Sequence, residues 1–266
     1  MGFDAGGTGR NQLLPWVIPA ACIAGWLFVS ESGRVPAYLL PHPAEIARAG
    51  YAYVMGDPGG GPYAGRFLSD ARASLGRVAL GFAIAALAGI PLGILSGRVG
   101  IVRRLFSGSV NAVRAVPGIS WLPLSLVWFG IGMKTTIFLV ALAAFFPIYL
   151  NAAAGARQVN PLLLQAGAMM GTGRIRGTAA ILIPGAMPHI LTGLRLGLGI
   201  SWAYLVLGEL TGVPNGLGAV IMDARMLGRI DIIIVGIIII AIMGQASDRM
   251  LTFLMRTCFK SARRTA

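Results

Sequence analysis

The chain has 266 residues, of which 56% are hydrophobic and only 12% are charged. Soluble domains carry roughly 25% charged residues, so this composition excludes an ordinary soluble protein and indicates several membrane-spanning helices. Lys and Arg outnumber Asp and Glu by 22 to 9. In a membrane protein such an excess marks the cytoplasmic segments, so we expect a lipid bilayer and no nucleic acid as the partner of these cations.

Six stretches are apolar over about the 20 residues needed to cross the hydrocarbon core. A charge at mid-bilayer costs about 3 kcal/mol on insertion scales, which makes uncharged stretches the natural candidates. The six are Asn11–Ser30, Val78–Gly97, Ala115–Met133, Thr135–Ala156, Pro184–Gly208 and Ile232–Met255. Arg195 interrupts the fifth, and Asp248 and Arg249 lie in the last turns of the sixth. We therefore expect an all-α polytopic membrane protein with six helices.

Basic residues gather in three of the segments outside these spans. They are Arg98, Arg103 and Arg104; Arg157, Arg174 and Arg176; and Arg256, Lys260, Arg263 and Arg264. By the positive-inside rule all three segments are cytoplasmic. This predicts a cytoplasmic N-terminus over residues 1–10, a basic cytoplasmic tail over 256–266, and a core over 73–255.

The connection over residues 31–72 is expected on the outer side. Pro43 suits the first position of a short helix, and Asp57–Pro62 is rich in Gly and Pro and predicts a break. The segment is too short and Gly-rich to form a domain. We expect a partly ordered elbow that follows the first span.

The cytoplasmic connection over residues 157–183 has the pattern of a helix, a glycine turn and a second helix. Pro161 suits a helix start, Gly171 and Gly173 end that helix, and Arg174 begins the next segment. Apolar and small residues recur at helical spacing at Leu162, Gln165, Ala166 and Met169. Small residues at 166–168 would let another surface approach closely, as in a docking helix.

This connection resembles the loop motif of ABC importer permeases, which reads Glu-Ala-Ala, three residues, Gly, nine residues, Ile, one residue, Leu-Pro. The chain offers Gln165-Ala166-Gly167, then Gly171, then Ile181-Leu182-Ile183-Pro184, with both gaps matching. Gln165 stands for Glu, Gly167 for Ala and Ile183 for Leu. The resemblance implies that the loop, with Met169 and Arg174, is a coupling helix held in a cleft of an ATPase, without the charge contact of the missing acid.

Four further segments resemble the nitrate, sulfonate, taurine and bicarbonate branch of these permeases. They are Leu40–Pro43, Trp128–Gly132, Phe145–Asn151 and Leu191–Arg195. The resemblance implies the transmembrane domain of a type I ABC importer in the bacterial cytoplasmic (inner) membrane, importing a small anion. It also implies a second copy of the chain, two copies of an ATPase subunit, and a periplasmic or lipid-anchored substrate-binding protein.

The chain is not expected to be an enzyme or to hold a cofactor. Gly171–Gly177 lacks the Gly-Lys-Ser/Thr ending that holds nucleotide phosphates, so ATP is expected on the partner subunits. His42 and His189 are isolated, which gives no metal-ligand spacing. Gly199–Ala203 lacks the closing glycine of a hydrolase nucleophile elbow.

Five residues are candidates for a translocation path, namely Arg195, Ser201, Trp202, Glu209 and Ser120. Intramembrane cations usually face a bundle interior or a water-filled path, although Arg195 could equally make a structural contact. Glu209 could instead be an exposed acid at the membrane interface, and the serines could bond to their own helix. Arg114, at the predicted cytoplasmic edge of the third span, fits a positive-inside anchor.

The two alternatives to an ABC permease are a secondary carrier or channel and a membrane-embedded enzyme, which would require a Ser/His pair or a metal cluster that the sequence does not show convincingly. A secondary carrier or channel would need no ATPase, but carriers usually hold coupling carboxylates in their spans, and acids are scarce here. An internal duplication would explain why Arg114–Trp121 and Arg195–Trp202 share Arg, three residues and Gly-Ile-Ser-Trp. The residues around the two copies do not match, which favours coincidence.

Overall fold

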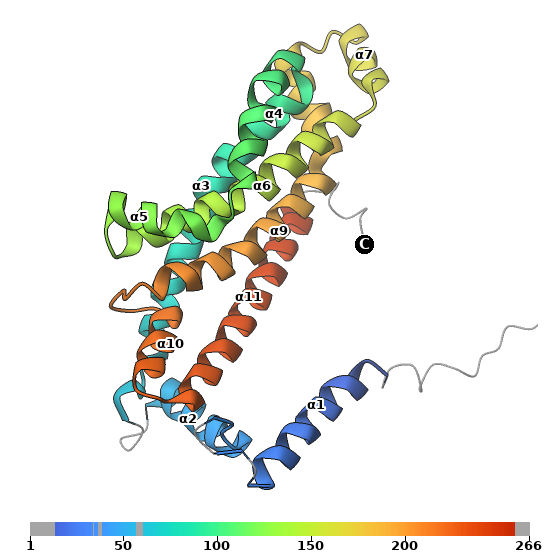
Figure 1. The fold of residues 1–266 in the computed structure, drawn as a ribbon. Coiled ribbons are helices and arrows are strands. Elements are labelled where there is room, and N and C mark those ends of the chain that lie inside the picture. The colour runs from blue at the N-terminus through green and yellow to red at the C-terminus, as the bar shows by residue number, and fades with distance from the viewer. Residues whose placement is uncertain (1–13, 34, 37–38, 57–60, 259–266) are drawn as a thin grey trace, which may run out of the picture. The chain divides into compact units, whose positions relative to one another are not determined.

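The computed structural model describes residues 14–33, 35–36, 39–56 and 61–258. All regular secondary structure in these ranges is helical, as the sequence predicts (Figure 1). The predicted N-terminal segment 1–10 lies outside the described residues, as do Lys260, Arg263 and Arg264 of the predicted basic tail.

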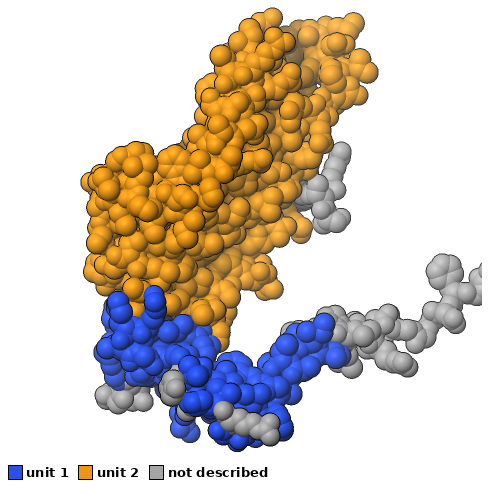
Figure 2. Space-filling model, viewed as in Figure 1, with its two compact units in different colours: residues 1–66, 223–235 blue, residues 67–222, 236–266 orange. Residues whose placement is uncertain are grey.

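The chain divides into two compact units, which Figure 2 colours separately. Unit 1 comprises residues 1–66 and 223–235, and unit 2 comprises residues 67–222 and 236–266. Unit 2 contains the predicted cytoplasmic connection and most of the predicted spans.

Unit 1 contains α1 (Leu14–Glu31), α2 (Pro43–Met55) and the short helix η1 (Gly61–Tyr63). Helix α2 begins at Pro43 as predicted, and the backbone N–H of Ala44 donates a hydrogen bond to Nδ1 of His42 at 3.2 Å. Gly56 ends the helix with a φ of 82°, a conformation that glycine adopts without steric cost. The predicted elbow therefore contains an ordered helix with defined ends.

The remaining helices belong to unit 2, except that the last residues of α10 and the first residues of α11 are assigned to unit 1. In chain order they are α3 (Phe67–Arg98), α4 (Gly100–Ala115), η2 (Gly118–Ser120), α5 (Trp121–Phe129), α6 (Met133–Gln158), α7 (Pro161–Met169), α8 (Arg174–Gly177), the π-helix η3 (Thr178–Leu182), α9 (Ile183–Glu209), α10 (Leu217–Met226) and α11 (Ile230–Cys258).

Four described helices are long and apolar enough to cross a membrane: α3, α6, α11 and the continuous helical segment 174–209. They contain the second, fourth, fifth and sixth predicted spans. In the described part of α1, the apolar helix Val17–Glu31 is shorter than these four. The count of six spans and the cytoplasmic placement of both termini therefore remain predictions.

The prediction of the third span as one helix over Ala115–Met133 is wrong. Helix α4 ends at Ala115, and the axes of segments 100–115 and 118–129 differ by 81°. Pro117 has no N–H to continue the helix and pushes the residue before it out of the helical region, so Val116 is extended, with ψ of 122°. Together the two pieces are long and apolar enough for one broken span.

The core of unit 2 is formed by α3, α6 and α9, which run alongside one another (Figure 1). Their backbones come close because glycines face neighbouring helices. A Cβ atom added to Gly93 of α3 would lie 2.6 Å from the carbonyl oxygen of Tyr149, and one added to Gly193 of α9 would lie 2.7 Å from Cβ of Asn151. Small residues at helix contacts are the usual means of close packing in membranes.

Two of the three basic segments lie at the same end of this core. Arg98, at the end of α3, donates a hydrogen bond to the hydroxyl of Thr178, which lies between α8 and α9. Helix α7 protrudes from this same end (Figure 1). This arrangement places Arg98 beside the segment that contains Arg174 and Arg176. The positive-inside rule requires such basic segments to lie on the same side of the membrane.

Replacement of Gly93 by Ala should destabilise the protein by about 1–3 kcal/mol, because the new methyl group overlaps the backbone of α6. The measurement is the unfolding midpoint of the purified protein in detergent. Gly76→Ala on the same helix is the matched control, since no atom lies within 4 Å of its added Cβ. Equal midpoints for the two variants would contradict the close packing of α3 and α6.

Candidate functional site

The loop between α6 and α9 forms the helix, turn and helix that the sequence predicts. Helix α7 begins at Pro161, and Oδ1 of Asn160 accepts a hydrogen bond from the N–H of Leu162 at 2.9 Å, an N-cap. Gly171 turns the chain with a φ of 83°, which disfavours any residue with a Cβ atom. The N–H of Thr172 then donates to the carbonyl of Gly167 at 2.9 Å, which closes the turn.

The tip of this loop exposes large apolar side chains. Met169, Met170 and Ile175 are 89%, 86% and 88% exposed. Gln165, Ala166 and Arg174 are also exposed, so the surface combines apolar contacts with a cationic edge. A patch of this kind, rimmed by polar residues, is typical of a protein contact surface.

Gly167 does not belong to that surface, contrary to the expectation that it faces a partner. It is buried, and a Cβ atom added to it would lie 2.6 Å from Cδ1 of Ile181. The missing side chain therefore lets α7 pack on η3 within the chain. Pro184 lies partly buried in the first turn of α9, directly after η3.

Arg195 makes the structural contact that was the alternative to a path-lining role. Its guanidinium binds both carboxylate oxygens of Asp248 at 2.9 and 2.8 Å, which ties α9 to α11. Such bidentate pairs combine charge with fixed geometry. Both residues line a cavity of about 330 Å³, so Arg195 stays only a candidate for the path.

Glu209 is fully buried, so the alternative of an exposed interfacial acid is wrong. Its carboxylate accepts hydrogen bonds from Arg77 at 2.6 Å, Ser74 at 2.8 Å and the backbone N–H of Gly218 at 2.8 Å. Arg77 also donates to the carbonyl and to the side-chain oxygen of Asn215, both at 2.7 Å. This buried cluster fastens the loop after α9 to the first turns of α3.

The remaining three path candidates have different surroundings. Ser201 is buried and donates to the carbonyl of Gly197 at 2.8 Å, within its own helix. Trp202 is 4% exposed, and its indole nitrogen has no hydrogen-bond partner among the described residues. Ser120 is exposed in η2. The structure brings none of the five candidates to the cavity formed by α4, α6 and α9.

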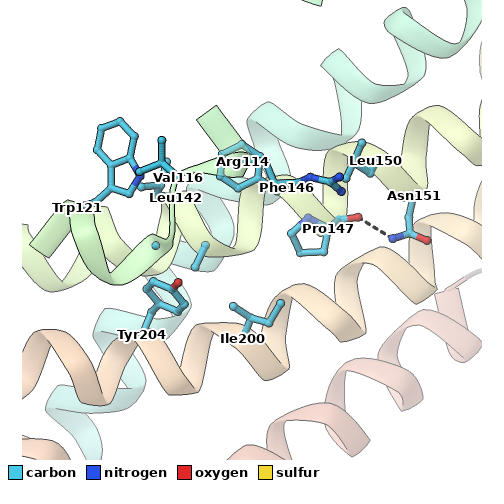
Figure 3. Close-up of a pocket in the computed structure, with 12 residues that line it drawn as sticks. Arg114, Val116, Trp121, Leu142, Phe146, Pro147, Leu150, Asn151, Ile200 and Tyr204 are labelled. Carbon is cyan, nitrogen blue, oxygen red and sulfur yellow. Dashed lines mark hydrogen bonds between the residues drawn. The ribbon is translucent and has the colours of Figure 1, made fainter. Parts of the chain in front are cut away.

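That cavity measures about 420 Å³ and lies against the middle of α6 (Figure 3). Its apolar wall includes Phe146, Pro147 and Ile200. Its polar lining consists of Arg114 from the end of α4, Trp121 from the start of α5, Asn151 from α6 and Tyr204 from α9. Mostly apolar walls with a few polar groups are typical of small-molecule sites.

Sequence reasoning missed this cavity because it placed Arg114 beside the cytoplasmic charges. In the structure Arg114 lies ten positions after Arg104 on α4, about 15 Å along the helix axis, and lines the cavity, while its role as an anchor stays a prediction. One signal in the sequence points to the site: Phe146, Leu150 and Asn151 recur at helical spacing, which places them on one face of a helix.

The fold and the protruding loop define a multi-pass helical membrane protein with an exposed apolar loop at one end. A solved structure entitled "Inward facing conformations of the MetNI methionine ABC transporter" superposes with a TM-score of 0.57, covering 70% of this chain and 94% of that chain. The sequence identity is 19%, so this likeness concerns the fold alone.

Residues 89–258 match the family described as the binding-protein-dependent transport system inner membrane component. The chain belongs to this family and is a permease component of an ABC importer. A relative in Bacillus subtilis, named as the aliphatic sulfonates transport permease SsuC, is 34% identical over 92% of this chain and 86% of its own length.

Two further relatives carry other substrate names. The taurine transport system permease protein TauC of Escherichia coli is 39% identical over 65% of this chain and 62% of its own length. The nitrate import permease protein NrtB of Synechocystis is 33% identical over 81% of this chain and 78% of its own length.

Replacement of Glu209 by Gln should destabilise the protein by about 3–5 kcal/mol, because it leaves Arg77 buried without a counter-charge. The free energy of unfolding in detergent measures the effect. Arg77→Gln should cost a similar amount, and the double variant should cost less than the sum of the two. Glu45→Gln, which alters an exposed acid, is the control. Strict additivity would show that the pair does not act as a unit.

Proposed function

We propose that this chain is the translocating subunit of an ATP-driven importer of a small anion in the bacterial inner membrane, with α7 and its turn docked on an ATPase subunit. The observation that carries the proposal is the exposed apolar tip of the loop at Met169, Met170 and Ile175. The full assembly would contain two copies of this chain, two ATPase subunits and an external binding protein.

The loop is suited to transmit movement from an ATPase to the spans. Helix α7 is joined to α6 by a turn at Asn160, and it packs through Gly167 on η3, which continues directly into α9. A force applied to the exposed face of α7 therefore acts on both α6 and α9. Differential binding of the ATPase to two loop positions would shift the spans between inward-open and outward-open states.

An anionic substrate is supported by the names of the relatives and by the lining of the cavity. The three relatives are named for sulfonates, taurine and nitrate. Sulfonates and nitrate are anions, and taurine carries a sulfonate group. The cavity lining contains one arginine and no acid. We therefore assign the import of a small oxyanion to this chain.

The alternative of a secondary carrier lacks a suitable coupling group in the described spans. Carriers that couple to protons or sodium use intramembrane carboxylates that change partners. Here Glu209 is bound to Arg77, Asp248 to Arg195, and Asp231 to Arg229, and Asp70 accepts from the N–H of Gly216. ATP hydrolysis on a partner subunit supplies the driving force instead.

The test is co-purification of the candidate ATPase with the full chain. Ala166→Arg places a long charged side chain on the exposed face of α7 and should reduce ATPase retention at least about tenfold, since a buried unpaired charge costs several kcal/mol. Ala166→Ser keeps a small side chain and should retain the ATPase.

Gly171 provides a second matched pair of variants. Gly171→Asp adds a charge beside the exposed Met170, whereas Gly171→Asn has the same size and tolerates the positive φ without a charge. Loss of the ATPase from Gly171→Asp and Ala166→Arg, together with its retention by Gly171→Asn and Ala166→Ser, supports docking at this surface. Equal retention in all four variants would place the docking site elsewhere, and no retention by the wild type would remove the ATPase as a partner.

A further inference from the structure

The cavity between α4, α6 and α9 is lined by an arginine that has no partner among the described residues. Among the described residues Arg114 makes no hydrogen bond or ion pair, whereas Arg77, Arg195 and Arg229 each bind a carboxylate. Arg114 is exposed, so its guanidinium is hydrated and open to a ligand. An anionic ligand would form a charge-assisted, bidentate contact with this free guanidinium.

The other polar groups of the lining can also donate hydrogen bonds. The amide nitrogen of Asn151 donates to the carbonyl of Pro147 at 2.8 Å, and its second hydrogen remains for a ligand. The indole N–H of Trp121 and the hydroxyl of Tyr204 make no hydrogen bond with other described residues. No carboxylate lines the cavity, so an ammonium group would find no counter-charge in it.

The charge lies at one end of the cavity and an apolar surface extends from it. Figure 3 shows the guanidinium of Arg114 on the side of Leu150 and Asn151, whereas Tyr204 and Trp121 lie toward the opposite end. Phe146, Pro147 and Ile200 contribute apolar surface to the lining. A bare inorganic oxyanion would neutralise Arg114 but leave this surface uncovered.

Gly118 fixes the position of the tyrosine at the far end. A Cβ atom added to Gly118 would overlap the hydroxyl and ring of Tyr204. The ring therefore lies directly on the backbone of η2 and bounds the cavity, which limits the length of any ligand that reaches it from Arg114.

We propose that this cavity binds an alkanesulfonate, with the sulfonate group on Arg114 and Asn151 and the alkyl chain along Phe146 and Ile200 toward Tyr204. This inference rests on the proposed import function and makes the permease itself selective. It predicts that butanesulfonate binds more tightly than methanesulfonate, by about fourfold per buried methylene. Taurine and nitrate bind more weakly, because the ammonium group of taurine finds no carboxylate and nitrate has no chain.

The test is binding to the purified complex of this chain with its ATPase in nanodiscs, without the binding protein. Isothermal titration is performed with butanesulfonate, methanesulfonate, taurine and nitrate. Arg114→Gln should abolish the binding of butanesulfonate, and Arg114→Lys should restore part of it. Arg103→Gln is the matched control, because Arg103 is an exposed arginine on the same helix outside the cavity.

A second variant examines the apolar end without changing the charge. Gly118→Ala should displace the Tyr204 ring and alter the dependence on chain length, while methanesulfonate binding should change less than butanesulfonate binding. Thermal unfolding of each variant shows whether it is folded, so that loss of binding is not confused with loss of structure.

The outcomes separate this inference from the proposed function. If the complex retains its ATPase but butanesulfonate binds equally to the wild type and to folded Arg114→Gln, the cavity is not the sulfonate site and the importer assignment stands. Equal or tighter binding of taurine or nitrate would overturn the assignment to alkanesulfonates. If the wild-type chain retains no ATPase, the proposed function fails whatever the binding data show.

Discussion

The close approach of α6 and α9 is the constraint on which the other features of unit 2 depend. Gly193 contacts the side chain of Asn151, and Gly197 faces Ile148, with an added Cβ 3.0 Å from Cγ1 of that residue. These contacts set the distance between two helices that together carry the protruding loop at one end and line the cavity at their middle. A larger residue at either glycine would separate the helices and move both features.

The two ends of this helix pair have opposite physical character. At one end Glu209, Arg77 and Asn215 form a buried ionic cluster that holds the loop after α9 on α3. At the other end α7 is exposed and joined to its neighbours by short turns and by the π-helix η3, a rare element often found at functional sites. A fixed end and an accessible end are what a subunit needs if a partner is to move its helices about a stable contact.

The sequence predicted the helical class, four of the spans and the shape of the loop, because these depend on local properties. Hydrophobic length marks the spans, and Pro161 and Gly171 mark the ends of α7. The bend at Pro117 and the amphipathic helix α4 were missed because the absence of charge over Ala115–Met133 outweighed a single proline.

Partners distant in the sequence could not be predicted in this way. Glu209 binds Arg77, which is 132 residues away, and only the packing of α3 against α9 brings them together. Arg114 was interpreted as a surface anchor because its membership of a cavity depends on the bend that follows it. In contrast, the pairing of Arg195 with Asp248 agrees with the general rule that charges within spans find partners.

The most direct test of the account is uptake of radiolabelled butanesulfonate by liposomes that contain this chain with its ATPase, with the binding protein supplied outside. If the chain is the permease of an ATP-driven importer, uptake requires ATP on the side of the membrane where the α7 loop lies, and a non-hydrolysable ATP analogue supports none. Uptake at the same rate by liposomes that contain this chain alone, without ATP or ATPase, would contradict the account and make the chain a carrier or channel.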